Sequence, residues 1–134
     1  MNTLIHKRIF VVDDDPFWTS ILFQMLTDLG YTNIISFSSG RECLNYLHLN
    51  PALIFLDYQM DDMNGLEVLQ GIKAYYPNIG VVFCTAYEDL SVAVNAIEFG
   101  SHDYLLKRNA NIKEVTSIMD NITKRPEFTK VPIA

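Results

Sequence analysis

The sequence predicts an α/β fold in which a parallel sheet is covered by helices on both faces. Short apolar runs alternate five times with stretches of helical periodicity, which is typical of strands joined by crossover helices. The runs at 53–57 and 79–84 are apolar with hardly a break, as strands buried on both faces are. With 134 residues, 49% of them apolar, the chain fits one domain with a substantial core.

Capping signals and breakers place the elements of the first half of the chain. The apolar run at 8–12 predicts the first strand, and it stops at three acids followed by Pro16. An aspartate before a proline at the first helical position is a strong helix start. Ser39 and Glu42 form a capping-box pattern for the next helix. The expected elements are strands at 8–12, 33–37 and 53–57, and helices at 16–29 and from 39 to about 48.

The second half of the chain continues the same alternation. Asn64 with Glu67, and later Asn111 with Glu114, are capping pairs that open helices, and Pro77 closes the first of these from outside. The expected elements are helices from 64 to before 77, at 88–99 and from 111 onward, and strands at 79–84 and 104–106. We expect residues 1–125 to form the domain and 126–134 to be a C-terminal tail or linker remnant.

Composition excludes several classes of protein. The formal charge of −6 argues against a self-sufficient nucleic-acid surface, which needs clustered Lys and Arg. No stretch approaches the roughly 18 apolar residues of a membrane span, and no signal peptide precedes the first strand, so we expect a cytoplasmic protein without membrane contact. Cys43 and Cys84 form no CxxC pair and have no third ligand nearby, which makes a zinc site or disulfide framework unexpected.

Polar and charged residues stand at the ends of the predicted strands. Asp13 and Asp14 follow the first strand, and Asp57 ends the third. Thr85 and Lys107 end the fourth and fifth. Because all parallel strands end at the same edge of a sheet, these side chains should converge there. Two carboxylates at 4 Å repel by about 4 kcal/mol at an effective dielectric constant near 20, so a cation is expected between them.

The residue types at this edge predict phosphoryl chemistry. Carboxylate oxygens with room for waters suit Mg²⁺ better than Zn²⁺. Lys107 supplies a point charge suited to a phosphoryl oxygen, and Thr85 adds a hydroxyl donor. Asp57 is then a candidate nucleophile, because carboxylates form aspartyl-phosphate intermediates.

The motifs that carry these residues resemble those of response-regulator receiver domains in two-component signal transduction, such as the chemotaxis regulators. They stand in order at 11–15 (VVDDD), 56–57 (LD), 84–86 (CTA) and 103–107 (DYLLK), and the resemblance covers roughly residues 7–125. It implies a flavodoxin-like, doubly wound parallel sheet of five strands in the order 2-1-3-4-5, with five helices.

The resemblance also implies a function and roles for single residues. A phosphoryl group would pass from the phosphohistidine of a histidine kinase, or from a phosphotransfer protein, to Asp57. Asp13, Asp14, Asp57 and the backbone carbonyl of Gln59 would hold Mg²⁺. The chain would be a phosphoacceptor rather than an enzyme with a separate substrate.

A switch follows from the same resemblance. Thr85 and Lys107 would contact the phosphoryl oxygens, and Tyr104 would rotate inward as Thr85 is drawn toward the phosphate. Attraction of a hydroxyl and an ammonium to a new dianion would shift the loops that carry them. The altered surface would then bind a downstream protein target, or an effector domain missing from this chain.

Two residues depart from the family pattern. Arg108 follows Lys107 where proline is usual, so we expect a trans peptide bond here and leave the geometry of Lys107 open. Asp61 also stands where proline is common. It places an additional negative charge near the site, which is expected to disfavour anionic phosphodonors.

Two alternative functions remain. The departures at Arg108 and Asp61 suggest a degenerate receiver that binds proteins independently of phosphorylation. A phosphatase on a related sheet would also use a strand-end aspartate. Such enzymes typically carry a second aspartate two residues later as acid and base, and Gln59 stands there instead.

Overall fold

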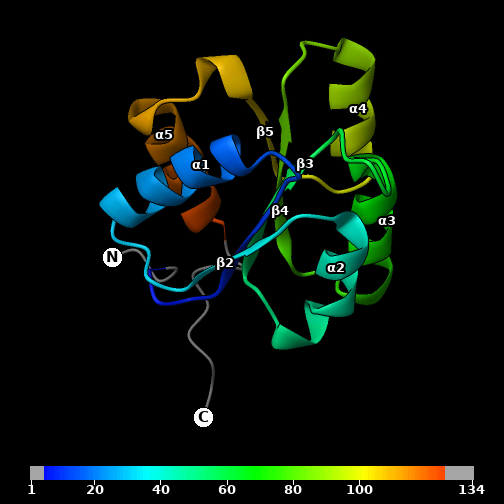
Figure 1. Ribbon diagram of the computed structural model, residues 1–134, viewed down its shortest axis with the longest axis horizontal. Helices are drawn as coiled ribbons and strands as arrows, with labels where there is room; N and C mark the ends of the chain where they lie inside the picture. The colour runs from blue at the N-terminus through cyan, green and yellow to red at the C-terminus, as the bar shows by residue number, and fades with distance from the viewer. Residues whose placement is uncertain (1–4, 126–134) are drawn as a thin grey trace.

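The computed structural model describes residues 5–125, in which strands and helices alternate along the chain (Figure 1). The elements are β1 (Ile9–Val12), α1 (Pro16–Asp28), β2 (Ile34–Phe37), α2 (Gly40–Asn45), a 3₁₀ turn (Leu47–Leu49), β3 (Leu53–Asp57), α3 (Gly65–Tyr75), β4 (Gly80–Thr85), α4 (Leu90–Glu98), β5 (Asp103–Leu106), a second 3₁₀ turn (Lys107–Asn109) and α5 (Ile112–Thr123). The tail predicted at 126–134 lies outside the described residues.

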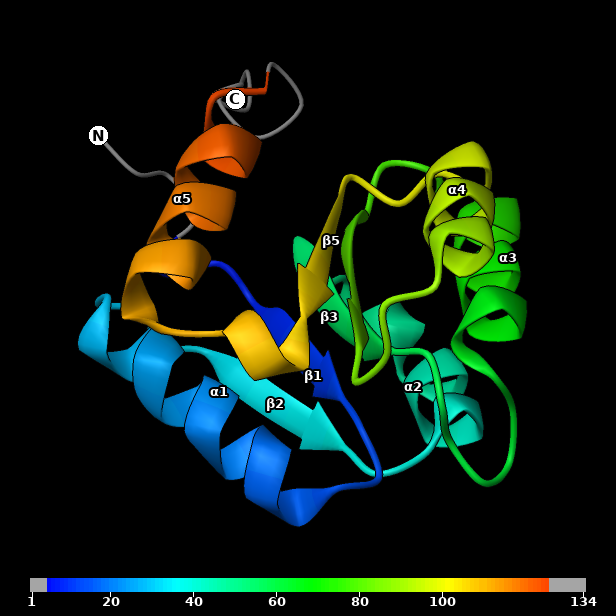
Figure 2. The same ribbon diagram turned by 90° about the horizontal axis from the view of Figure 1, so that it is seen from above.

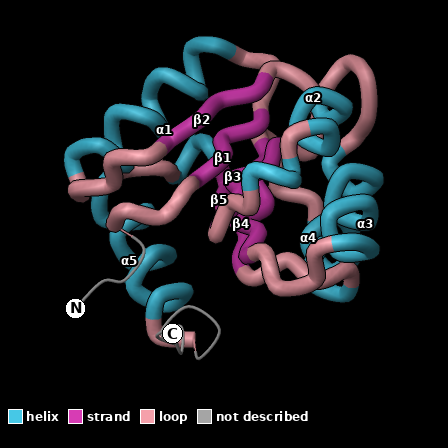
Figure 3. The backbone as a smooth tube through the Cα atoms, turned by 90° about the horizontal axis from the view of Figure 1, so that it is seen from below, coloured by secondary structure: helices cyan, strands magenta, loops and turns pink. Residues whose placement is uncertain are grey.

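The five strands form one parallel sheet in the order β2-β1-β3-β4-β5. This order confirms the expected topology. The central strand β3 pairs with β1 on one side and β4 on the other, with Leu56 opposite both Val12 and Phe83. Seen from below, the strands lie between two layers of helices (Figure 3). All strands therefore end at one edge of the sheet, and that edge carries the site.

Each face of the sheet has its own core. Helices α1 and α5 cover one face, and α2, α3 and α4 cover the other (Figure 2). Strand residues alternate between the two cores, so that Phe55 packs toward α1 and α5 while Ile54 and Leu56 pack toward α2 and α3. Strands β1, β3 and β4 are buried along their whole length, as their apolar sequences predict.

The helix starts agree with the capping signals. Asp15 caps α1 ahead of Pro16, and Ser39, Asn64 and Asn111 each accept a hydrogen bond from the N–H of the glutamate three residues on. Within residues 5–125, no helix is long and apolar enough to cross a membrane.

Two helix boundaries differ from the prediction. The second helix ends at Asn45 instead of about 48, and a 3₁₀ turn leads to Asn50 in the left-handed conformation. The helix expected at 88–99 begins at Leu90, because the Asp89 carboxylate caps it through the N–H groups of Ser91 and Val92. Glu88 is thereby left outside the helix.

Candidate functional site

Three carboxylates meet at the carboxyl edge of the sheet. Asp57 is the last residue of β3, and Asp13 and Asp14 follow β1, which pairs with β3. Carboxylate oxygens of the three residues lie within 4.8 Å of one another. Asp13 and Asp57 are buried, whereas Asp14 is exposed. The cluster is thus built from two neighbouring strand ends and opens toward solvent through Asp14.

Lys107 supplies the positive charge of the site. Its Nζ lies 2.7 Å from Asp13 Oδ2 and 3.1 Å from Asp57 Oδ1. The peptide bond to Arg108 is trans, as expected, and a 3₁₀ turn over Lys107–Asn109 leads the chain away from the sheet. Replacement of the usual proline by Arg108 therefore leaves Lys107 directed at both buried carboxylates.

The environment shifts the titration of all three partners. Burial raises the pKa of Asp57 to about 6, and the charge of Asp13 adds to the rise while Lys107 opposes it. Burial likewise raises the pKa of Asp13, against the hydrogen bond from Lys107. For Lys107, burial favours the neutral amine, but the hydrogen bond to Asp13 and the charge of Asp57 outweigh it and raise the pKa. One ammonium thus leaves the acidic cluster short of positive charge.

This shortage of charge fits a divalent cation. The donors are carboxylate oxygens, which are hard ligands that suit Mg²⁺. Asp13 and Asp57 are both buried and repel each other, and a bound cation would reduce this repulsion. Asp13, Asp14 and Asp57 are therefore the residues that could hold Mg²⁺. Gln59 is exposed in the loop after β3, and its backbone carbonyl remains a predicted ligand.

Thr85 and Tyr104 belong to the neighbouring strands β4 and β5, in which Tyr104 is opposite Phe83 and Thr85 is opposite Leu106. Thr85 is buried at the end of β4, and its Oγ1 accepts a hydrogen bond from the Tyr87 N–H. The Tyr104 ring stacks on Phe83 with a centroid distance of 6.4 Å, and its hydroxyl donates to the Tyr87 carbonyl oxygen at 3.3 Å. Tyr104 is half-buried, so both side chains contact the loop that leads from β4 to α4.

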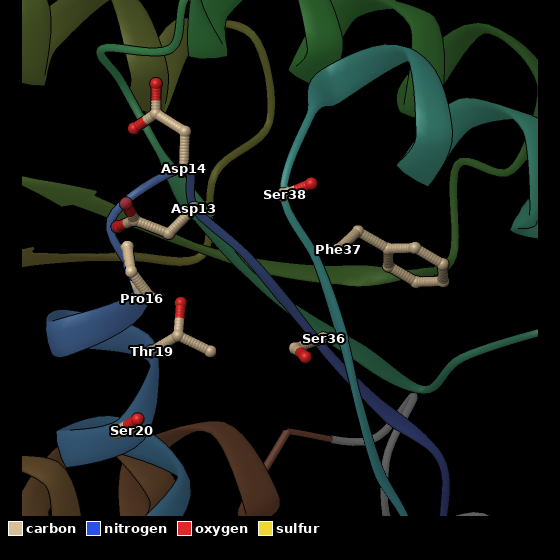
Figure 4. A pocket seen from close by; sticks show the side chains of 8 residues that line it. All are labelled: Asp13, Asp14, Pro16, Thr19, Ser20, Ser36, Phe37 and Ser38. Carbon is tan, nitrogen blue, oxygen red and sulfur yellow. The ribbon is translucent and has the colours of Figure 1, made fainter.

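A pocket of about 360 Å³ lies beside the acidic cluster, between the start of α1 and the end of β2 (Figure 4). Asp13 and Asp14 form one end of its lining, and hydroxyl side chains line much of the rest. Its lining residues are Asp13, Asp14, Pro16, Thr19, Ser20, Ser36, Phe37 and Ser38. The pocket gives solvent a route to the two aspartates that follow β1.

Trp18 serves both the core and the site. It lies on α1, is 6% exposed, and packs in the core between the sheet and the helices α1 and α5. Lys107 Nζ lies 5.5 Å from the centroid of its ring, within the range of a cation–π contact. Because Trp18 is the one tryptophan in the sequence, its fluorescence is a natural probe of this site.

Sequence reasoning missed the contacts of the loop at 58–64. The backbone N–H of Asp61 donates to Asp14 Oδ2 at 3.1 Å. The Asp62 carboxylate accepts from the N–H groups of Gly40 and Arg41 at 3.1 and 2.9 Å. Proline has no N–H, so its absence at 61 was the signal that a new donor stands beside the acidic cluster.

Arg108 is paired on the surface rather than in the site. Its Nη2 lies 2.7 Å from Glu88 Oε2, and the side chains are 61% and 74% exposed. An exposed pair of this kind contributes little to stability. It joins the loop after β5 to the loop after β4.

Comparison with known proteins agrees with the fold. The family model of the response regulator receiver domain matches residues 9–120. The chemotaxis protein CheY of Thermotoga maritima is 30% identical over 102 residues, which are 75% of this chain and 85% of CheY. The luminescence regulatory protein LuxO of Vibrio campbellii is 35% identical over 99 residues, which are 72% of this chain but only 21% of LuxO.

A solved structure gives the same picture. The signal receiver domain of a LuxO repressor protein from Vibrio parahaemolyticus superimposes with a TM-score of 0.80 at 27% identity, covering 89% of this chain and 92% of that one. The alternation of strands and helices, the sheet order and the acidic edge therefore have one common explanation. The chain belongs to the family of response-regulator receiver domains, the signalling phosphoacceptors of two-component systems.

Proposed function

We propose that Asp57 accepts a phosphoryl group from the phosphohistidine of a histidine kinase or of a phosphotransfer protein, with Mg²⁺ held by Asp13, Asp14, Asp57 and the Gln59 carbonyl. The observation that supports this most directly is the position of Asp57. Its carboxylate is buried at the carboxyl end of the central strand, 3.1 Å from Lys107 and within 4.8 Å of two further carboxylates. A group so placed is a nucleophile beside its own charge-stabilising partners.

The transfer requires one bond to form and one to break. A carboxylate oxygen of Asp57 attacks the phosphorus of the donor, so that a P–O bond forms while the P–N bond of the phosphohistidine breaks. The bonding pair leaves on the imidazole nitrogen, and the other ring nitrogen already carries the proton of the neutral leaving group. Lys107 stabilises the charge that develops on the phosphoryl oxygens. Bound Mg²⁺ would supply further positive charge at the same oxygens.

Ionisation of Asp57 is a condition for the attack. With a pKa of about 6, its carboxyl group is largely ionised at pH 7.5, although burial and Asp13 oppose the charge. The site thus keeps a reactive carboxylate that is poorly solvated and incompletely neutralised. Phosphorylation would replace this carboxylate by an acyl phosphate and release Lys107 Nζ toward the phosphoryl oxygens.

The proposed switch uses Thr85 and Tyr104. The Thr85 hydroxyl would donate to a phosphoryl oxygen, which takes the buried end of β4 toward the site. Tyr104 contacts the same loop through its bond to the Tyr87 carbonyl oxygen. A movement of Thr85 would therefore break or remake that bond, and the surface around α4 and β5 would present a different shape to a downstream protein target or effector domain.

Labelling with acetyl phosphate tests the proposal. We expect Mg²⁺-dependent incorporation of at most one phosphoryl group per chain, detected by intact-protein mass spectrometry. Asp57→Ala should abolish it, while Asp120→Asn, which removes an exposed acid on α5, should leave it unchanged. Equal labelling of the Asp57→Ala variant would refute the assignment of the phosphoacceptor.

Two other functions remain outcomes of measurement. A receiver that works without phosphorylation would fail to bind beryllofluoride with Mg²⁺. The replacement of proline by Arg108 does not favour this alternative, because Lys107 still contacts both Asp13 and Asp57. A phosphatase would release many equivalents of phosphate from small esters. Gln59, exposed and without an ionisable group, does not offer the proton transfer that such turnover needs.

A further inference from the structure

The loop from β3 to α3 is fixed at both of its ends. At its start, the Tyr58 N–H donates to the Cys84 carbonyl oxygen, and at its close the Gly65 N–H donates to the Tyr58 carbonyl oxygen at 2.7 Å. A Cβ on Gly65 would lie 2.4 Å from the Asp57 carbonyl oxygen. The backbone of this loop is therefore closed tightly against the phosphoacceptor strand.

The middle of the loop is tied to α2. The Asp62 carboxylate accepts two backbone hydrogen bonds, from Gly40 and Arg41, at the start of that helix. A Cβ on Gly40 would lie 2.5 Å from Val68 Cγ2, so the helix start also packs closely against α3. The two hydrogen bonds join residues that are 22 and 21 positions apart in sequence, and they hold the loop against the start of α2.

The same loop touches the acidic cluster through Asp61. Asp13 and Asp57 are buried and paired with Lys107, whereas Asp14 is exposed and receives a hydrogen bond from the Asp61 N–H. An exposed carboxylate that is already ordered loses less conformational entropy when it binds a cation. Proline at position 61 would have no N–H to order it.

We propose that Asp61 and Asp62 act together as a clamp: the Asp62 carboxylate fixes the loop to α2, and the Asp61 N–H thereby orients the Asp14 carboxylate for a divalent cation. Both are positioning residues that act through Asp14. The departure from proline at 61 is then a gain of a donor, and not only an added negative charge. This inference rests on the proposed function, because it assumes that Asp14 is a cation ligand.

The first test needs no metal. Amide hydrogen exchange, followed by NMR in EDTA, reports on the Asp61, Gly40 and Arg41 N–H groups directly. We expect Asp62→Ala to speed exchange at all three positions, and Asp14→Ala to speed it at Asp61 alone. Unchanged exchange at Asp61 in both variants would show that the clamp does not exist in solution.

The second test measures Mg²⁺ affinity by isothermal titration, with Trp18 fluorescence as an independent readout. Asp61→Ala keeps the N–H and removes a charge, so it is the matched control and should change the dissociation constant less than about twofold. Asp61→Pro and Asp62→Ala should weaken Mg²⁺ binding about threefold to tenfold. Loss of a residue that holds a metal ligand typically weakens metal binding by about tenfold or more, and we expect less here because these contacts are exposed. Asp62→Asn retains an acceptor and should lie closer to the wild type.

The outcomes separate the clamp from the proposed function. If Asp61→Pro binds Mg²⁺ as tightly as Asp61→Ala, the N–H does not orient Asp14 and the inference is wrong. If Asp61→Pro does not fold, Asp62→Ala takes its place in the test. The inference is equally wrong if Asp62→Ala binds Mg²⁺ as tightly as Asp61→Ala does. If the wild type does not bind Mg²⁺ saturably, or if Asp57→Ala binds it as well as the wild type does, the proposed function fails instead. Amide exchange still decides whether the clamp is present.

Discussion

Removing the charge of Asp57 should stabilise the metal-free protein. The carboxylate is 3% exposed, shares Lys107 with Asp13, and has a pKa raised to about 6 by burial and by the charge of Asp13. Folding thus disfavours its ionised form. Asn at this position keeps the shape and a hydrogen-bond acceptor for Lys107 but carries no charge, so Asp57→Asn removes the unfavourable term while Asp13 remains paired.

The size and the pH dependence of the effect follow from that pKa. The rise from 3.8 to about 6 corresponds to a penalty of about 3 kcal/mol at a pH above both values. Because the raised pKa belongs to an acid, the penalty is absent below about pH 4 and complete above about pH 6. The free energy of unfolding of the wild type should therefore fall, relative to Asp57→Asn, as the pH rises through this interval. Because this pKa already includes the attraction of Lys107, the expected gain in the free energy of unfolding at pH 7.5 is about 3 kcal/mol.

Urea unfolding in EDTA, at several pH values from 4.5 to 7.5, measures this difference. Asp120→Asn on the exposed surface of α5 is the matched control and should stay within about 0.5 kcal/mol of the wild type at every pH. An Asp57→Asn variant that is no more stable than the wild type at pH 7.5 would contradict the reasoning. A stability difference that does not shrink toward pH 4.5 would contradict the assignment of its cause.

Three further predictions concern the cation, the lysine and the arginine. Mg²⁺ at a hundred times its dissociation constant should raise the free energy of unfolding by about 2.7 kcal/mol, and a gain of the same size in Asp57→Ala would place the cation elsewhere. Lys107→Met leaves Asp13 and Asp57 without their shared counter-charge and should cost about 3 kcal/mol at pH 7.5 in EDTA, as urea unfolding would show; an unchanged stability would mean that the pair is not formed. Arg108→Ala breaks an exposed pair and should cost less than about 1 kcal/mol without changing acetyl phosphate labelling, so a tenfold loss of labelling would give Arg108 a role in the site.

The fold was predictable because its signals are local and repeated. The buried strands β3 and β4 are continuous apolar runs, and side-chain caps at Asp15, Ser39 and Asn64 mark helix starts. Boundaries were predicted less well where two signals compete. At the start of α4, Glu88 and Asp89 are both acids, and only the geometry shows which one caps the helix.

The acidic edge was predictable for a topological reason, and the lysine geometry was not. Parallel strands end at one edge of the sheet, and β1 pairs with β3, so Asp13 and Asp57 had to lie close together once the strand order was known. Whether Lys107 would still reach the carboxylates with Arg108 after it depended on the turn that the backbone takes there. The 3₁₀ turn over Lys107–Asn109 answers this without proline, since Lys107 is its first residue and its Nζ lies 2.7 Å from Asp13 Oδ2 and 3.1 Å from Asp57 Oδ1.

Contacts across the loop at 58–64 were beyond sequence reasoning because they join backbone groups to side chains far apart in the chain. From the sequence, Asp61 is only a residue that replaces the common proline and adds a negative charge. That description concerns the side chain. The structure shows that the replacement also changes the backbone, where the N–H that proline lacks donates to Asp14. The same distinction applies to Asp62, whose carboxylate serves the N–H groups of a neighbouring helix rather than the site. Residues that depart from a family pattern should therefore be judged by the donors and acceptors that they add, as well as by those that they remove.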